Sequence, residues 1–270
     1  MLTFFNTKTK KTFHYTNNIN LLIQFIRRDI YSQYAGSIAG LLWTIITPLS
    51  QLLVYTFLFS IVFKVRLSKV DAGTESFMLF FLSGLLPWTA FSDALSKSIG
   101  IIIQNSNLIT KVAFPVELLP ISTVCSSFIL AGSGWLLFLI WLLWNGTPSI
   151  YWLLLPLPVL FFFIFTLGLA WMLSSICVYI RDIQQFLAVI LNLWFYFTPI
   201  LYPLSMVPLS IQWVIKLNPI YYFIELVRDI LFRSTLNTST LLISLAISVL
   251  LLISGYFCFK KLKHGFADVI

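Results

Sequence analysis

Few residues of this sequence have a type and spacing that could support catalysis. The two histidines, His14 and His264, lie in the terminal tails, where a solvated side chain is expected. The sequence shows no Ser-His-Asp arrangement or pair of carboxylates at a membrane face, and no Cys/His spacing typical of a metal site. The motif G-x-x-x-x-G-K-[ST], with which a phosphate loop holds ATP, is also absent. We therefore expect no enzyme activity, no bound metal and no cofactor in this chain.

The charged residues also argue against an ion-driven pump. The apolar stretches long enough to cross a bilayer contain no ionisable residue, except that Asp93 lies near one end of one stretch. A proton or sodium relay needs such groups inside the membrane. If the chain transports a substrate actively, the energy has to come from another subunit.

Composition predicts an integral membrane protein. Of the 270 residues, 59% are hydrophobic and 10% are charged, whereas about 25% of a typical soluble domain is charged. A helix needs roughly 20 apolar residues to cross the bilayer core. We predict an all-α fold with a cytoplasmic tail and interface helix (1–35) and a six-helix transmembrane domain (36–270). The predicted spans are 38–63, 77–95, 118–144, 151–179, 184–201 and 240–259.

The basic residues predict the orientation of the chain. A net charge of +8 would suggest nucleic acid for a soluble protein, but these residues lie mostly in loops and tails, so no nucleic-acid partner is expected. With a cytoplasmic N-terminus, eleven of the 17 Lys and Arg residues fall inside. The six outside are Lys64, Arg66, Lys69, Lys216, Arg228 and Arg233. The positive-inside rule therefore favours a multi-pass protein with both termini cytoplasmic.

An amphipathic segment precedes the first predicted span. Apolar residues recur at helical spacing across Ile19–Tyr34, and Asn17 or Asn18 could cap the start of this helix. The segment is too polar to cross the membrane. We expect it to lie along the cytoplasmic surface with Arg27 and Arg28 near lipid phosphates. A simple topological anchor is the alternative.

Two connections are more than simple loops. Residues 97–117 form a 21-residue cytoplasmic connection, where helix–helix connections usually need about 2 to 8 residues. On the outer side, 202–239 contains two short apolar runs joined by Asn218-Pro219. These runs predict two short helices that dip back into the outer leaflet. Within them Glu225, Arg228 and Asp229 lie one helical turn apart, so they either pair with each other or shape an exit.

Four motifs resemble those of one transporter family. They are NSNLITKVAFP (105–115) followed by Glu117, YIRDI (179–183), WFYFTPILY (194–202) and Asn218-Pro219. The first closely resembles the coupling segment of polysaccharide-exporting ABC transporter permeases, which are type-2 exporters of O-antigen, capsule or teichoic-acid chains. The others resemble the family's turn between spans four and five, its fifth-helix ending and its outer re-entrant turn. Val116 departs from the pattern, because relatives often carry a basic residue there.

The resemblance implies half of an exporter in the bacterial inner membrane. Two copies of the chain would form a homodimer and engage two cytoplasmic ATP-binding subunits, which would hold ATP and Mg. The residues implied to couple to the ATPase are Asn105, Asn107, Leu108, Lys111, Phe114, Pro115, Glu117, Arg181 and Asp182.

The resemblance also implies a path for the polymer between the first and fifth spans. The channel-lining candidates are Trp43, Tyr55, Phe59, Phe186, Trp194 and Tyr196, whose rings could stack on sugar faces. Ordinary interfacial aromatics are the alternative for each of them. Asn218, Pro219, Glu225 and Arg228 are the candidates for an outer gate.

Arginines near the cytoplasmic face are suited to phosphate. Arg27, Arg28 and Arg181 could meet the diphosphate of a lipid-linked polysaccharide, since guanidinium groups bind phosphate through paired donors. Ordinary anionic membrane lipid is the alternative for Arg27 and Arg28, and a pair with Asp182 is the alternative for Arg181. O-antigen is the expected cargo. Teichoic acid, capsule, a drug or a lipid remain alternatives, as does a membrane scaffold with no transport role.

Overall fold

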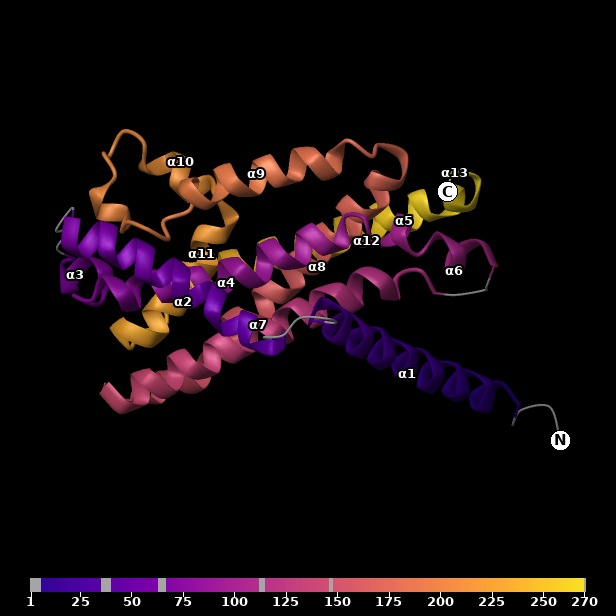
Figure 1. Ribbon diagram of the computed structural model, residues 1–270, viewed down its shortest axis with the longest axis horizontal. Helices are drawn as coiled ribbons and strands as arrows, with labels where there is room; N and C mark the ends of the chain where they lie inside the picture. The colour runs from indigo at the N-terminus through magenta and orange to yellow at the C-terminus, as the bar shows by residue number, and fades with distance from the viewer. Residues whose placement is uncertain (1–5, 35–39, 63–66, 112–114, 146–147, 270) are drawn as a thin grey trace.

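The computed structural model describes residues 6–34, 40–62, 67–111, 115–145 and 148–269 (Figure 1). Every regular element in these ranges is a helix and none is a strand, which confirms the all-α prediction for them. The long helices run roughly along the longest axis of the molecule, and α1 (Asn6–Tyr34) lies at an angle to them.

Within the described ranges, four helical stretches are long and apolar enough to cross a bilayer. They are α4 (Phe77–Ser98), α7 (Leu118–Asn145), α8 (Pro156–Tyr179) with the preceding 3-10 turn η3 (Ile150–Leu154), and α12 (Thr238–Leu262). The first and fifth predicted spans correspond to shorter helices. These are α2 (Trp43–Thr56), which continues as the π-helical η2 (Phe57–Val62), and α9 (Ile183–Phe197). The crossing of all six therefore stays a prediction.

Short helices gather at the two ends of the long axis (Figure 1). At the end we call the α6 end lie α5 (Ile101–Gln104), α6 (Ser106–Lys111), η6 (Lys263–Gly265) and α13 (Phe266–Val269). Toward the opposite, α10 end lie α3 (Lys69–Ala72), α10 (Gln212–Leu217), α11 (Pro219–Arg228) and η5 (Asp229–Arg233). The remaining short elements are η1 (Gly40–Leu42) and η4 (Leu204–Met206).

Prolines set two of the helix boundaries. Helix α9 ends at Phe197, short of the predicted Leu201. The reason is Pro199, which disfavours helical backbone at Thr198, and that residue is extended with φ −93° and ψ 132°. Pro156 begins α8, where its missing N–H leaves no hydrogen bond unmade, so the fourth predicted span is divided between η3 and α8.

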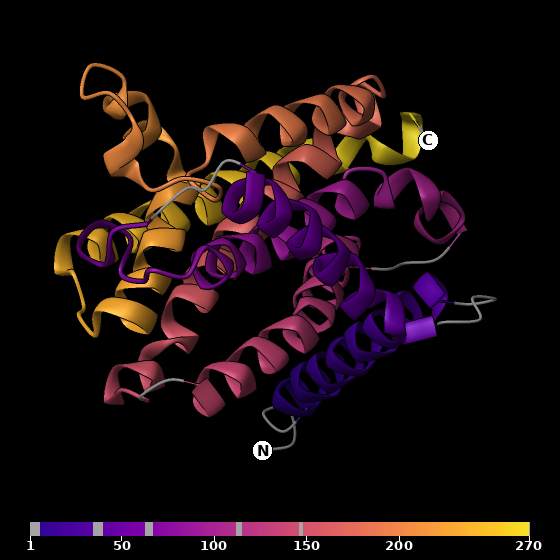
Figure 2. The ribbon, with the colours of Figure 1, turned by 60° about the vertical axis from the view of Figure 1, so that its left-hand side comes forward.

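The helix predicted to lie along the membrane surface is longer than its apolar pattern suggested. Helix α1 begins at Asn6, so the predicted cap at Asn17 or Asn18 is wrong. Neither Gly nor Pro occurs before Tyr34, and nothing in the sequence ends the helix earlier. Helix α1 lies alongside α7 (Figure 2).

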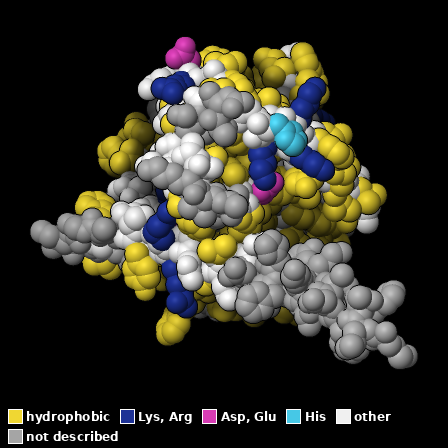
Figure 3. Space-filling model, turned by 90° about the vertical axis from the view of Figure 1, so that its right-hand side faces the viewer, with side chains coloured by type: hydrophobic (Ala, Val, Ile, Leu, Met, Phe, Trp, Pro, Cys, Tyr) yellow, Lys and Arg dark blue, Asp and Glu magenta, His cyan; other side chains and the backbone are white. Residues whose placement is uncertain are grey.

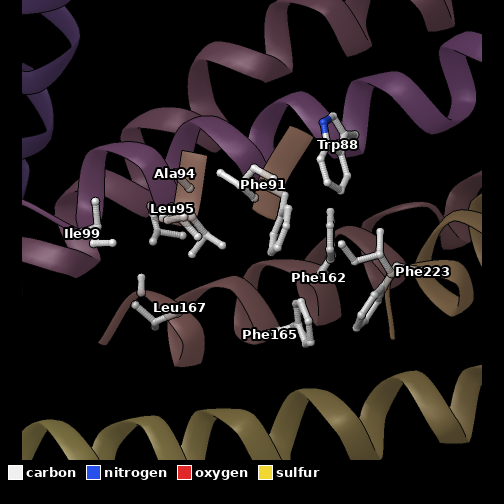
Figure 4. Close-up of a cluster of buried hydrophobic side chains, with 14 of the residues drawn as sticks. Trp88, Phe91, Ala94, Leu95, Ile99, Phe162, Phe165, Leu167 and Phe223 are labelled. Carbon is white, nitrogen blue, oxygen red and sulfur yellow. The ribbon is translucent and has the colours of Figure 1, made fainter. Parts of the chain in front are cut away.

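An aromatic core joins α4, α8 and α11. In Figure 4, Trp88 and Phe91 of α4 face Phe162 and Phe165 of α8 and Phe223 of α11. The ring centroids of Phe162 and Phe223 lie 4.9 Å apart, and those of Phe91 and Phe162 lie 5.4 Å apart. This cluster holds α4 and the short helix α11 against α8.

Helices α8 and α12 approach until their backbones touch. A Cβ atom added to Gly255 would lie 2.1 Å from the carbonyl oxygen of Gly168. Nearby, Ser248 Oγ donates to the carbonyl of Phe161 at 2.8 Å. Small residues permit such close packing between membrane helices, where dispersion contacts replace the hydrophobic effect.

Candidate functional site

The predicted coupling segment, 97–117, lies at the α6 end and continues directly from α4. Asn105 separates α5 from α6, and its Nδ2 donates to the carbonyl of Ile101 at 2.8 Å, which satisfies an acceptor at the end of the short helix. Asn107 is exposed and Leu108 is half-buried. The side chain of Lys111 and all of Phe114 fall outside the described residues.

Helix α1 is bonded to this segment. Arg28 Nη1 donates to Asn105 Oδ1 at 3.3 Å, and Arg28 Nη2 donates to Asp29 Oδ1 at 3.4 Å. Ser122 Oγ of α7 donates to the other carboxylate oxygen of Asp29, Oδ2, at 3.3 Å. Burial raises the pKa of the Asp29 carboxyl, and the charge of Arg28 partly offsets that rise. Of the three arginines predicted to meet phosphate, Arg28 thus has partners within the chain although it is exposed, and Arg27 is exposed as well.

Glu117 is also engaged within the chain. Lys263 Nζ donates to Glu117 Oε1 at 2.7 Å, so the start of α7 is paired with the end of α12. Trp171 Nε1 donates to the Glu117 carbonyl at 3.2 Å. Pro115, beside it in the motif, is half-buried. A sequence alone cannot show such a pairing, because the partners lie far apart along the chain.

The turn between α8 and α9 presents the other predicted coupling residues. Arg181 and Asp182 are both exposed, and the structure shows no ion pair between these two residues, so it does not support the alternative of an internal pair. Next to them, Tyr179 Oη donates to the carbonyl of Leu262 at 2.8 Å. Figure 3 views the α6 end and shows Lys and Arg side chains gathered among apolar ones. This face is accessible and basic.

A polar cavity of about 410 Å³ lies between α2, α4 and α9. Among the residues that the structure describes, its lining contains aromatic rings, hydroxyls and amides but no charged side chain. The lining residues are Gln51, Tyr55, Leu85, Trp88, Thr89, Ser92, Ser96, Ala188, Leu191, Asn192, Phe195 and Tyr196. Such a lining can exchange hydrogen bonds with a neutral polar ligand and offer rings to its apolar faces.

The structure separates the six predicted channel aromatics. Tyr55 and Tyr196 line the cavity. Phe59 instead stacks on Phe77, with centroids 5.1 Å apart, and Trp194 packs edge-on against Phe91.

The other two aromatics are exposed elsewhere. Phe186 is 63% exposed on α9, and Trp43 borders a second cavity at the start of α2.

The polar lining residues were missed from the sequence. Thr89, Ser92 and Ser96 recur at intervals of three and four residues along α4, which places them on one face of that helix. That spacing was a usable signal within an otherwise apolar span. Gln51 and Asn192 complete the lining from α2 and α9, and no sequence pattern connects these two residues to α4.

Asn218 joins two of the motifs. Its Oδ1 accepts from Trp194 Nε1 at 2.9 Å and from the Ile220 amide at 3.0 Å, and its Nδ2 donates to Thr198 Oγ1 at 2.8 Å. Asn218 therefore caps α11, which Pro219 begins, and binds the end of α9 at the same time. The fifth-helix ending and the outer turn are one hydrogen-bonded unit.

Arg228 is buried at the end of α11, with 1% of its surface exposed. It donates to the carbonyls of Pro199 at 2.8 Å and Phe80 at 3.2 Å and to Ser83 Oγ at 3.3 Å. Its guanidinium also lies 3.5 Å from the centre of the Phe80 ring. Carbonyls at the broken end of α9 have no helical donor, and Arg228 supplies one.

Of the pairing predicted among Glu225, Arg228 and Asp229, the structure contains the ion pair between Arg228 and Glu225 but none between Arg228 and Asp229. Arg233 pairs with both carboxylates, and it also donates to the carbonyl of Asp71 at 2.6 Å. Arg228 approaches Glu225 only at 3.9 Å, because its donors point at the carbonyls of α4 and of the chain after α9. Helical spacing identified the neighbours but not the direction in which Arg228 points.

Comparison with known proteins decides the family. The family model described as "ABC-2 type transporter" matches residues 20–232, a range that includes the predicted coupling segment, the cavity and the Asn218-Pro219 turn. The chain belongs to the ABC-2 type transporter family. The resemblance inferred from the motifs is thereby confirmed, and this ABC-2 permease is a membrane-embedded transport subunit.

Named relatives cover almost the whole ABC-2 chain. "O-antigen export system permease protein RfbA" of Klebsiella pneumoniae is 30% identical over 93% of this chain and 95% of its own length. The protein of the same name from Myxococcus xanthus is 32% identical with the same coverage. "Polysialic acid transport protein KpsM" of Escherichia coli is 24% identical over 75% of this chain and 77% of its own.

Proposed function

We propose that this chain is the transmembrane subunit of an ATP-driven exporter that carries lipid-linked O-antigen polysaccharide across the bacterial inner membrane. The observation that carries the proposal is the uncharged polar cavity between α2, α4 and α9, on the same helix that leads into the coupling segment. Similarity to the RfbA permeases over nearly the full chain supports O-antigen as the cargo.

The cavity chemistry suits a neutral sugar chain. Sugar hydroxyls both donate and accept, as the amides of Gln51 and Asn192 do. The rings of Tyr55 and Tyr196 can lie against the apolar faces of sugars. Each contact is weak, because a hydrogen bond exchanged with water contributes only about 1 kcal/mol net. A long polymer can therefore move along such a lining without being trapped.

The coupling we propose runs through α4. Two copies of the chain engage two ATP-binding subunits, which hold ATP and Mg and press on α5 and α6 when they close. Because α4 is continuous from Ser98 back to Thr89, that push reaches the cavity wall. The bond from Arg28 to Asn105 carries α1 along with the segment.

The topology belongs to the same proposal. All six candidate helices cross the membrane, the α6 end faces the cytoplasm, and both termini lie on that side. Arg27, Arg28 and Arg181 then lie at the depth of lipid phosphates, including the diphosphate of a lipid-linked precursor. If labelling of the termini in intact cells placed them on opposite sides, α5 and α6 could not reach an ATPase and the proposal would fail.

The cavity is tested by replacing its amides. In a strain that lacks this gene, Gln51→Leu combined with Asn192→Leu should insert normally but lower surface polysaccharide at least tenfold. The matched control is Ser254→Leu, a polar-to-leucine change at an exposed position of α12, which should restore the polymer fully. Normal surface polymer in the cavity variant would reject the proposed path.

The coupling segment is tested separately. Alanine at Asn107, Leu108 and Lys111 should leave the protein in the membrane but abolish both surface polymer and ATP hydrolysis that depends on this chain. Hydrolysis that is unaffected by the triple variant would reject the assigned role of α6.

Similarity to KpsM favours capsule polysaccharide as the second candidate cargo. Polysialic acid carries a carboxylate on each sugar. The described lining of the cavity offers no cation to balance that charge, so a neutral polymer fits better. Typing the polymer that a deletion strain loses decides between O-antigen and capsule. A teichoic-acid, drug or lipid cargo would leave both unchanged.

A further inference from the structure

A polar stripe runs along α4 in the half that leads to α5. It consists of Thr89, Ser92, Asp93, Ser96 and Lys97. Their intervals of three and four residues put them on one face of the helix. Ionisable groups in a membrane helix are costly and usually mark a functional position. The first cavity uses the stripe's hydroxyls but neither of its charges.

A second cavity of about 370 Å³ lies on the other flank of this stripe. Its volume falls within the range of roughly 300–1,000 Å³ typical of ligand pockets. The second cavity shares Thr89, Ser92 and Ser96 with the first, and its other lining residues come from α1, α2, α4 and α7. These residues include Gln33 of α1, Trp43 and Thr47 of α2, Asp93 of α4 and Ser127 of α7.

Asp93 retains an oxygen for a ligand. Ser127 Oγ donates to Asp93 Oδ2 at 2.6 Å, and Lys97 Nζ donates to the same oxygen and to Gln33 Oε1 at 2.8 Å. No residue in the described ranges donates to Asp93 Oδ1. The Asp93 side chain is 37% exposed, so a ligand in the cavity can reach it.

The lining selects one chemical class. A phosphate is disfavoured, because Asp93 would repel it and Lys97 is already neutralised by Asp93. A lipid chain would cover Asp93 Oδ1 without offering it a hydrogen-bond donor. A neutral sugar fits this lining better. Its hydroxyls can donate to Asp93 Oδ1, and its apolar face can cover the half-exposed ring of Trp43.

We propose that this second cavity binds one neutral sugar residue of the exported polymer, with Asp93 as hydrogen-bond acceptor and Trp43 as stacking platform. The inference rests on the proposed function and adds a specificity site to it. The shared hydroxyls of Thr89, Ser92 and Ser96 connect this site to the first cavity, so the same polymer can contact both.

Photo-crosslinking in cells tests the sugar site in the second cavity separately from the proposed passage of the polymer through the first cavity. A benzophenone amino acid is placed at Thr47 in the second cavity, at Asn192 in the first, and at Ile253 on the exposed face of α12 as the control. After illumination, a permease attached to polymer runs as a ladder that stains with periodate. We expect ladders from Thr47 and Asn192 and none from Ile253. A ladder from Asn192 without one from Thr47 would overturn the sugar site alone, and its absence from both would overturn the proposed function as well.

A substitution tests the acceptor directly. Asp93→Asn keeps the shape of the side chain but replaces a charged acceptor, so crosslinking from Thr47 should fall about tenfold while crosslinking from Asn192 changes less than twofold. Asp93→Glu should recover part of the yield. Equal yields from Thr47 with Asp93 and with Asn would overturn the role of the carboxylate. A merely structural role would lower the yield at both positions together.

Discussion

Helices α8 and α12 pack backbone to backbone, whereas α2 and α9 stand on either side of a polar cavity. In the first pair, Gly168 and Gly255 leave no room even for a methyl group. In the second pair, Tyr55 and Phe195 are in ring contact at 6.3 Å, and amides and hydroxyls line the space beside them. All four helices are mainly apolar in sequence, but only α8 and α12 are long enough to meet the length criterion for a membrane span.

The difference shows where this permease can change shape. Close packing with serine-to-backbone bonds favours a rigid pair, since any separation would lose many dispersion contacts at once. A cavity imposes no such cost. We therefore expect α8 and α12 to act as a frame and α2 and α9 to adjust around the polymer, with α4 between the two regions.

The largest expected effect comes from the frame. Gly255→Ala puts a methyl group against the carbonyl of Gly168, and forced separation of such packing costs about 2 kcal/mol or more. The measurement is the unfolding free energy of the purified protein in a detergent titration. Gly132→Ala on α7 is the matched control, because no atom lies within 4 Å of its added Cβ. Alanine there should stabilise the helix by up to about 1 kcal/mol, and equal losses at both glycines would contradict the frame.

The next effect concerns Arg228, which joins α11 to α4 and to the chain after α9. Arg228→Met removes the donors for the carbonyls of Pro199 and Phe80, and these two buried acceptors left unpaired cost about 1 kcal/mol each. The end of α9 should then loosen, so a cysteine at position 192 should react faster with a hydrophilic thiol reagent. Arg181→Met removes an exposed arginine and should change neither stability nor reactivity. A stable Arg228 variant would show that the guanidinium is dispensable.

Two neighbouring aromatics on α9 should then behave differently. Trp194→Phe loses the bond to Asn218 and should cost about 1 kcal/mol of stability. Tyr196, which is 59% exposed and lines the cavity, should tolerate alanine without loss of stability but with reduced export. The assay pairs thermal unfolding with surface polymer. If Tyr196→Ala unfolded the protein while Trp194→Phe only slowed export, the assignment of the two rings would be reversed.

The smallest effect is expected at the α6 end. Lys263→Met breaks the pair with Glu117, and partly exposed ion pairs contribute about 0–1 kcal/mol. Because this pair joins the start of α7 to the frame helix α12, its loss should free the coupling segment slightly and raise ATP hydrolysis in the absence of polymer. Lys260→Met, at an exposed position on the same helix, is the control. Identical hydrolysis in both variants would show that the pair does not restrain coupling.

The sequence by itself determined the class of this protein and the order of its elements. Apolar runs longer than a bilayer thickness can form only helices in lipid, so α7 and α12 were predictable from composition and length. Pro156 and Pro199 marked local boundaries, although the length criterion overrode Pro199 and extended the fifth span too far. Motif spacing was sufficient to identify the family.

Only the tertiary structure decided which side chains meet. The partners of Arg228 lie on α4 and after α9, and Lys263 pairs with Glu117 across most of the chain. Such contacts depend on how helices pack, and apolar membrane helices show too little periodicity to reveal which face turns inward. The same reason explains why the six predicted channel aromatics divide into packing, cavity and surface roles. From the sequence one can predict that a polar residue in a membrane helix needs a hydrogen-bond partner, but only the tertiary structure shows which residue that partner is.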